Sequence, residues 1–228
     1  MIINVFGLGI LFQTLETTKR AVSAARDQAA AAVAANKISE ELYISQERPW
    51  VSLDHVVFIE PLRVDGGAVN AVLRFVLKNV GHSPATNVWV EPKLMLLNSW
   101  KSPVVRFPVD AQREICDDPL RFKSPNAGPV IFPDGEGYIS YSLATSAQEL
   151  AESRANPDPN SKALMPYLVG CVDYRFTFSP EHHQTGFIFA VYRKQRDGLG
   201  PLLSTEDGTV EPDDLILDPT IGSGIRID

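Results

Sequence analysis

Two different periods of apolar residues divide the chain. Up to about residue 47 the apolar positions recur in steps of three and four, which is typical of a helix with one apolar stripe. From Trp50 onward apolar and polar residues alternate, which is typical of strands with one buried face. The pattern therefore predicts a long helix followed by an all-β body. The positions of the helical stripe are Leu8, Leu11, Leu15, Thr18, Val22, Ala25, Ala29, Ala32 and Asn36.

The distribution of helix-breaking residues supports the long helix. All 17 prolines lie at or after Pro49, and no glycine lies between Gly9 and Gly66. Residues 21–35 include nine alanines, and alanine is the best helix former. We predict a helix over roughly residues 3–47, which would be about 65 Å long, ended by Pro49. Residues 1–48 form the first predicted unit, with an apolar tip (1–15) and an Ala-rich stalk (16–48).

The apolar tip carries no charged side chain. As a helix it covers roughly 21 Å, compared with about 30 Å of bilayer hydrocarbon. A secretory signal would begin with positive residues, whereas Lys19 and Arg20 follow the apolar run here. Three interpretations stay open: a short membrane anchor, an interfacial helix, or a helix buried in an oligomer. We favour the anchor, with residues 2–15 in contact with the lipid bilayer, because so apolar a run is unfavourable in water.

The helical stripe also permits self-association through residues 8–36. Its steps of three and four form a heptad seam, and Asn36 at a seam position could set register and oligomer number. The alanines allow close helix approach but bury little apolar area, so such association would be weak. A coiled coil and a lone spacer helix both stay open.

Residues 49–194 contain about seven or eight alternating runs without intervening helices. Turn signals at residues 65–67, 79–81 and 133–135 separate them. This arrangement predicts an antiparallel β-sandwich. Ser146 and Glu149 form a plausible capping box for a short helix over 147–154, and the polar segment 109–128 is left unassigned.

Composition and charge place the chain among soluble globular proteins, with 44% apolar and 21% charged residues. There are 21 basic and 28 acidic side chains, a net charge of −7, which argues against a nucleic-acid partner. Residues 195–228 hold two basic and eight acidic side chains, and we expect an acidic, loosely ordered tail. Within this tail the run 215–217 predicts one edge strand.

No group of residues shows the spacing of a catalytic or metal site. Adjacent residues on a strand point to opposite faces, so His182 and His183 are ill-placed to share a metal, and we expect them in a solvated turn. His55 is expected to be a hydrogen-bonded core or rim residue. We expect Asp173 and Arg175 to form an exposed ion pair. We therefore predict no catalytic, cofactor-binding or metal-binding residues, no cofactor and no enzyme activity.

Two further sets of residues bear on calcium binding and on disulfide formation. The carboxylates at 213, 214 and 218 do not fit a twelve-residue calcium loop. Cys116 and Cys171 could pair if the body faces an oxidising compartment, and the sequence leaves this open.

Two short motifs carry a resemblance to a known group of proteins. The first is Arg48-Pro49-Trp50-Val51, which follows the Ala-rich helix, and the second is Asn79-x-Gly81-x-x-Pro84-Ala85. The chain from about residue 8 to 90 resembles uncharacterised bacterial membrane-anchored proteins. In these a transmembrane segment runs into an Ala-rich helix, and an Arg-Pro-Trp/Tyr-Val junction opens a β-rich domain. The resemblance implies an immunoglobulin-like sandwich and supplies no activity.

These observations lead to one expected function and one alternative. We expect a non-enzymatic, membrane-tethered β-sandwich module that binds an unidentified protein partner. The resemblance implies the bacterial inner membrane, and the positive residues after the tip place the body on the cytoplasmic side. The alternative is a structural assembly protein in which N-terminal helices form an oligomeric bundle that displays the sandwiches.

Overall fold

The structure is a computed structural model in which the chain forms two compact units, Met1–Glu47 and Arg48–Asp228. It describes residues 3–65, 67–97, 106–118, 128–154, 163–177, 179–195, 198–199, 203–204 and 208–219.

The first unit is a single helix, α1 (Ile3–Glu47), as the absence of helix breakers predicted. Its polar side chains are satisfied within the helix: Thr14 Oγ1 donates to the carbonyl of Ile10 at 2.7 Å, and Arg20 pairs with Glu16 one turn away. The large apolar side chains described between Ile10 and Tyr43 are exposed, with Leu11 at 68% and Phe12 at 74%. No helix within the described residues is both long and apolar enough to cross a membrane.

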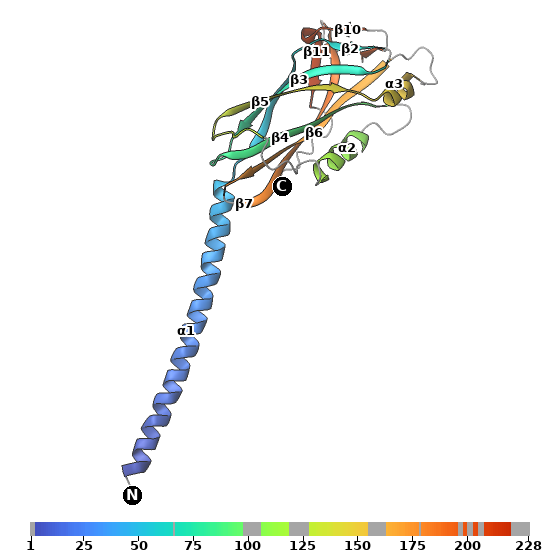
Figure 1. Ribbon diagram of the computed structural model, residues 1–228. Coiled ribbons are helices and arrows are strands. Elements are labelled where there is room, and N and C mark those ends of the chain that lie inside the picture. The colour runs from blue at the N-terminus through green and yellow to red at the C-terminus, as the bar shows by residue number, and fades with distance from the viewer. Residues whose placement is uncertain are drawn as a thin grey trace. The chain divides into compact units, whose positions relative to one another are not determined.

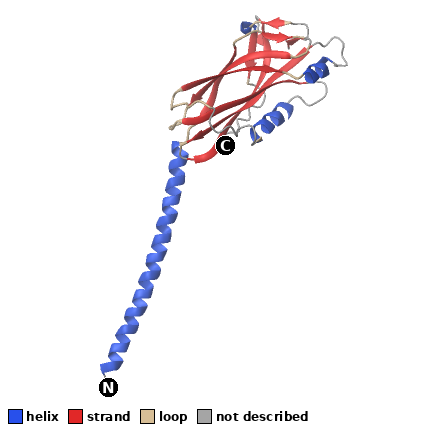
Figure 2. Cartoon of the chain, viewed as in Figure 1, coloured by secondary structure: helices blue, strands red, loops and turns tan. Residues whose placement is uncertain are grey.

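The second unit contains two antiparallel sheets (Figures 1 and 2). In the first sheet β3 is central, with β1 on one side and β5 on the other. Its strands are β1 (Val51–Phe58), β2 (Leu62–Val64), β3 (Val69–Asn79), β5 (Glu136–Ala144) and β10 (Thr209–Val210). In the second sheet β6 lies between β4 and β7, and β7 also pairs with β11. Its strands are β4 (Ala85–Leu97), β6 (Ala163–Phe176), β7 (Ser179–Gln195), β8 (Gly198–Leu199), β9 (Leu203–Ser204) and β11 (Leu215–Asp218).

The predicted class, mainly β with a long N-terminal helix and antiparallel pairing, is confirmed. The described residues form more strands than the seven or eight expected, because β2, β8, β9 and β10 have only two or three residues each, too few for alternation to show. The apolar run 215–217 forms the predicted edge strand, β11, which pairs with β7. A 3-10 turn, η1 (Pro212–Asp214), precedes it.

The main core lies between the two sheets. Leu73, Phe75 and Leu77 alternate along β3, and all three are fully buried. From the opposite sheet Phe187 packs on Phe75 with 5.6 Å between the ring centroids. Burial of this alternating face is the principal source of stability for the sandwich.

A second core lies on the other face of β6, under a helix that the sequence did not predict. This helix, α2 (Arg106–Asp117), overlaps the polar segment 109–128, for which the sequence predicted no element. It covers a cluster that includes Tyr167, Val169 and Cys171, all fully buried. Because α2 covers this face, Tyr167, Val169 and Cys171 are buried on the side of β6 that faces away from the first sheet.

The short helix α3 (Ala147–Arg154) confirms the predicted capping box. The backbone N–H of Glu149 donates to Ser146 Oγ at 3.1 Å, and the backbone N–H of Ser146 donates to the Glu149 carboxylate at 2.8 Å. The two bonds satisfy donors that a helix start otherwise leaves unpaired.

The two sequence motifs meet at Asn79, a fully buried side chain at the end of β3. Asn79 Oδ1 accepts from the backbone N–H of Trp50 at 3.2 Å and of Gly81 at 3.0 Å. Asn79 Nδ2 donates to the carbonyls of Ser83 at 2.8 Å and Ile131 at 3.0 Å. A Cβ at Gly81 would lie 2.4 Å from the backbone nitrogen of Trp50, so a residue larger than glycine does not fit at this position. Asn79 therefore joins the start of β1 to the turn after β3 and to the segment before β5.

Candidate functional site

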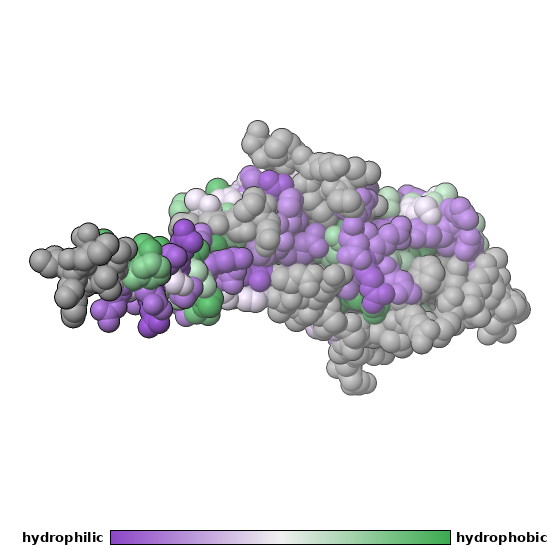
Figure 3. All heavy atoms as spheres, turned by 90° about the horizontal axis from the view of Figure 1, so that it is seen from below, coloured by the Kyte–Doolittle hydropathy of each residue, from purple (hydrophilic) through white to green (hydrophobic). Residues whose placement is uncertain are grey.

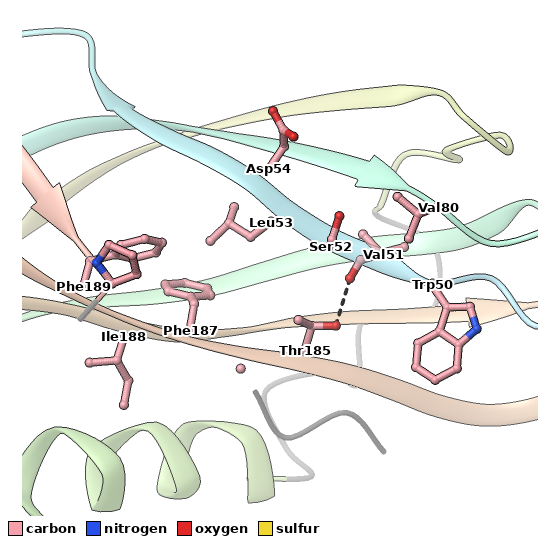
Figure 4. Close-up of a pocket in the computed structure, with 12 residues that line it drawn as sticks. Trp50, Val51, Ser52, Leu53, Asp54, Val80, Thr185, Phe187, Ile188 and Phe189 are labelled. Carbon is pink, nitrogen blue, oxygen red and sulfur yellow. Dashed lines mark hydrogen bonds between the residues drawn. The ribbon is translucent and has the colours of Figure 1, made fainter. Parts of the chain in front are cut away.

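A groove of about 360 Å³ lies between β1 and β7. Figure 4 shows Leu53 from β1 and Phe187 and Phe189 from β7 turned toward the same space, with Trp50 at one end. The full lining is Trp50, Val51, Ser52, Leu53, Asp54, Val80, Thr185, Gly186, Phe187, Ile188, Phe189 and Pro219. The groove is thus lined largely by apolar side chains from two strands in different sheets.

The groove exists because two strand edges stop pairing there. Within the described residues, β1 pairs only with β3, so its other edge is free. On the far side of β7 from β6, β11 pairs with Ala190–Arg193 and stops at Asp218. The edge of β7 from Thr185 to Phe189 therefore has no partner among the described strands.

Polar contacts join the two strands between Phe187 and Trp50 in the groove. Thr185 Oγ1 donates to the carbonyl of Val51 at 2.8 Å, which joins β7 directly to β1 (Figure 4). Beside this bond Tyr174 is fully buried, and burial raises the pKa of its hydroxyl while the nearby Arg48 guanidinium opposes the shift. Arg48 in turn stacks over the Trp50 ring, 4.6 Å from its centroid. Trp50 is held in place by this stacking and by its bond to Asn79.

Few of the side chains that line the groove are polar. Its polar side chains are Ser52, Asp54 and Thr185, and Asp54 is already paired with His55 Nδ1 at 2.7 Å on the exposed side of β1. No nucleophile among them has a base within hydrogen-bond reach in the described part of the chain. On the face shown in Figure 3, the apolar residues among the described ones form only small areas between polar residues.

The histidines predicted to lie in a solvated turn belong to β7 instead, because β6 and β7 pair almost to their joining turn. His183 is buried, with its ring 5.8 Å from that of Tyr174. His182 is exposed and faces Asp173. His55 is bonded to Asp54 and half exposed, which agrees with a rim position.

Asp173 is buried at 3% exposure, so the expected exposed ion pair with Arg175 is wrong. His182 Nδ1 lies 2.9 and 3.0 Å from its two carboxylate oxygens, and Arg175 donates to the other ring nitrogen of His182. Gln184 Nε2 bridges the Asp173 carboxylate, at 3.4 Å, to the carbonyl of Cys116, at 3.0 Å. The cluster ties β6 and β7 to the end of α2. Sequence reasoning missed this because it did not place α2 over β6.

Asp173 should make the stability of the body depend on pH. Burial raises the pKa of its carboxyl, and the contact with His182 only partly opposes the shift. The folded state therefore holds the proton more tightly than the unfolded state, and this contribution to stability is lost as the pH rises above about 4. We expect the unfolding free energy of the wild type to fall relative to Asp173→Asn as urea titrations move from pH 4 toward neutrality. Asp54→Asn, at an exposed carboxylate, is the control, and parallel wild-type and Asp173→Asn curves would contradict the assignment.

Cys116 at the end of α2 and Cys171 in β6 form a disulfide, a pairing that the sequence left open. Their Cα atoms are 5.5 Å apart and both side chains are buried. The bond fixes α2 over the second sheet, next to the Asp173 cluster.

No group of three or more metal-ligating side chains lies together in the described residues. Asp213 and Asp214 lie in η1. Asp218 is the last residue of β11, and its side chain is buried. The prediction that no residue holds a metal or cofactor stays a prediction.

The chain was compared with models of protein families, with curated proteins and with solved structures, and none of them matches it.

Proposed function

We propose that this protein is a non-enzymatic binding module with an immunoglobulin-like sandwich. The pairing of its strands supports the finer assignment of the fold. In the first sheet β1, β3 and β5 are neighbours, and in the second β4, β6 and β7 are neighbours. Taking β1, β3, β4, β5, β6 and β7 as strands A, B, C, E, F and G, this is the A-B-E and C-F-G pairing of immunoglobulin-like sandwiches.

The observation that carries the proposed function is the apolar groove between two free strand edges. An extended peptide in such a groove can pair its backbone with a strand edge while alternate side chains enter apolar pockets. An apolar side chain of the peptide would pack against Leu53 and Phe187 in the groove. The partner is therefore a protein segment in extended conformation with an apolar residue at alternate positions.

Selection from a phage-displayed library of random peptides tests this function. We expect the body, ending at Pro219, to enrich peptides with alternating apolar residues and to bind them with micromolar affinity. Leu53→Arg should weaken that binding by about a hundredfold, because it places a charge against apolar ring surfaces. Val57→Arg is the matched control, since Val57 is exposed on the same strand outside the groove. Failure to enrich any peptide, or equal losses in both variants, would refute the groove as the site.

The apolar tip of α1 supports tethering to a membrane through residues 2–15. In the described part of this tip the exposed side chains include Ile10 at 63% and Leu15 at 52%, in addition to Leu11 and Phe12. Apolar area of this extent is stabilised by contact with lipid or with a second helix. We propose the lipid contact, at the bacterial inner membrane that the resemblance implies, and the helix bundle remains the alternative.

Flotation with anionic liposomes distinguishes the two. We expect the full chain to float and a variant with serine at positions 10, 11, 12 and 15 to lose at least about tenfold in bound fraction. Serine at Val22 and Val33, which are exposed farther along α1, is the control and should not alter flotation. A full chain that stays unbound and scatters light as a concentration-dependent oligomer would favour the bundle instead.

Two observations bear on the compartment of the body and point in opposite directions. Lys19 and Arg20 after the apolar tip favour the cytoplasmic side. A disulfide between Cys116 and Cys171 favours an oxidising compartment, because such bonds are rare in the cytosol. The oxidation state of these two cysteines in cells, treated in the Discussion, decides between them.

A further inference from the structure

The two faces of β7 beside the groove have different surroundings. Phe187 and Phe189 pack against the core between the sheets, whereas Ile188 points toward α2 and belongs to the second core (Figure 4). Gly186 lies on the same face as Ile188, because residues two positions apart in a strand share a face. All four residues line the groove. The groove therefore follows the edge of β7 itself and is bordered by both faces of this strand.

Over the outward face of Gly186 lies a buried amide with an unused donor. Gln112 of α2 is 5% exposed, and its Nε2 atom has no hydrogen-bond partner among the described residues. A Cβ at Gly186 would lie 2.2 Å from this nitrogen, so the glycine provides the space that the amide occupies. Buried donors in folded proteins are nearly always paired, because an unpaired one is unfavourable. Gln112 therefore supplies a donor that a ligand at this edge can use.

We propose that the partner segment pairs with residues 185–189 of β7 and that Gln112 selects a hydrogen-bond acceptor in that segment. This inference rests on the proposed function and names the class of segment that the groove binds. The segment's residue opposite Phe187 lies between the sheets, next to Leu53, and is apolar. Its neighbour opposite Gly186 falls on the side of α2 and carries an acceptor oxygen, as Asn, Asp, Ser and Thr do. The partner is thus an extended segment with an apolar residue next to an acceptor residue.

Two observations favour β7 over β1 as the strand that pairs with the segment. Over residues 185–189 the register of β7 with β6 is unbroken, whereas the register of β1 with β3 shifts between Leu53 and His55. A strand edge with such an irregularity is a poor template for pairing. The edge of β7 already pairs with β11 from Ala190 onward. A partner segment therefore continues a row of pairing that the fold already uses.

The amide of Gln112 can reach the segment without a movement of α2. The last torsion of a glutamine side chain has a broad energy minimum, so the amide turns at little cost. The helix itself is held by the disulfide between Cys116 and Cys171 and by the bond from Gln184 to the Cys116 carbonyl. Gln112 lies one helical turn before Cys116. The donor is therefore held over β7 by contacts close to it in the same helix.

Peptides selected on the full chain from a phage-displayed library test the role of Gln112. They should carry an acceptor next to an apolar residue, and alanine in place of the acceptor should weaken binding about tenfold. Gln112→Met keeps the length of the side chain but removes the donor. It should weaken binding by the same factor and make the alanine exchange in the peptide neutral. Gln148→Met, at an exposed glutamine of α3, is the matched control and should bind both peptides like the wild type.

Hydrogen exchange shows which strand the peptide pairs with. The bound peptide should slow exchange about tenfold at those amides of residues 185–189 that point to the free edge of β7, and leave β1 nearly unchanged. Slower exchange in β1 alone, selected peptides without an acceptor preference, or a tenfold alanine effect that persists in Gln112→Met would overturn the inference, while the groove stays the binding site. If the full chain enriches no peptide, the proposed function and the inference fail together.

Discussion

Replacing Asn79 by alanine is expected to lower the free energy of unfolding of the body by about 4 kcal/mol. The substitution removes four hydrogen bonds from a fully buried side chain. It leaves two backbone N–H groups, of Trp50 and Gly81, and two carbonyls, of Ser83 and Ile131, without this partner. Buried polar groups that lose their partners cost more than the net value of the bond itself. Urea titration followed by tryptophan fluorescence measures the loss.

Two further variants show whether the hydrogen bonds are responsible. Asn79→Asp keeps the size of the side chain but replaces the two donor hydrogens with an acceptor, so we expect most of the loss to remain. Asn70→Ala removes an exposed amide that bonds only to Asp65 at 3.0 Å in the described contacts, and it should cost less than about 1 kcal/mol. A loss below about 1 kcal/mol for Asn79→Ala would mean that the turn after β3 does not depend on this side chain.

Loss of the disulfide is expected to destabilise the body by a similar amount. Cys116 and Cys171 are 55 residues apart, and closing a loop of that length restricts the unfolded chain by about 4 kcal/mol. The double substitution of both cysteines by alanine also removes apolar contacts under α2. We therefore expect the midpoint of urea unfolding to fall markedly in the double variant under oxidising conditions.

Reduction of the wild type is the control for this effect. Dithiothreitol should bring the wild type close to the double variant and leave the double variant unchanged. Equal stability of all four samples would mean that the bond does not form in the purified protein. Alkylation of thiols in intact cells before lysis then reports the compartment: protected cysteines favour an oxidising one, and reactive cysteines favour the cytoplasmic side.

Several elements could be predicted because their signals are local. The absence of glycine and proline from residues 10–48 is sufficient to predict α1, and the Ser146–Glu149 pair is sufficient to predict the start of α3. In the body, alternation along β3 and β6 indicated strands because one face of each is buried against the other sheet. These features depend on residues within a few positions of one another.

The error at Asp173 follows from the position of α2. Helix α2 is amphipathic, with Val109, Ala111, Ile115 and Cys116 on the side that packs on the second core, but this short pattern lies in a polar stretch and was not recognised. Without it, Asp173 appeared to face solvent and the two cysteines had no reason to meet. The groove was missed for a related reason, since Leu53 and Phe187 are 134 positions apart and lie in different sheets.

By itself the sequence determined the division into a long helix and an alternating body, because helix breakers and hydrophobic period act within a few residues. The turn at residues 79–81 was also recognisable in the sequence, whereas the contacts of Asn79 with Trp50 and Ile131 join distant segments. Only the tertiary structure decided which strand edges stay unpaired, where the Cys116–Cys171 bond forms and how β1 and β7 enclose the groove. Those features depend on contacts between distant segments, and the free energy that selects them comes from packing two sheets and a helix together, not from any one segment.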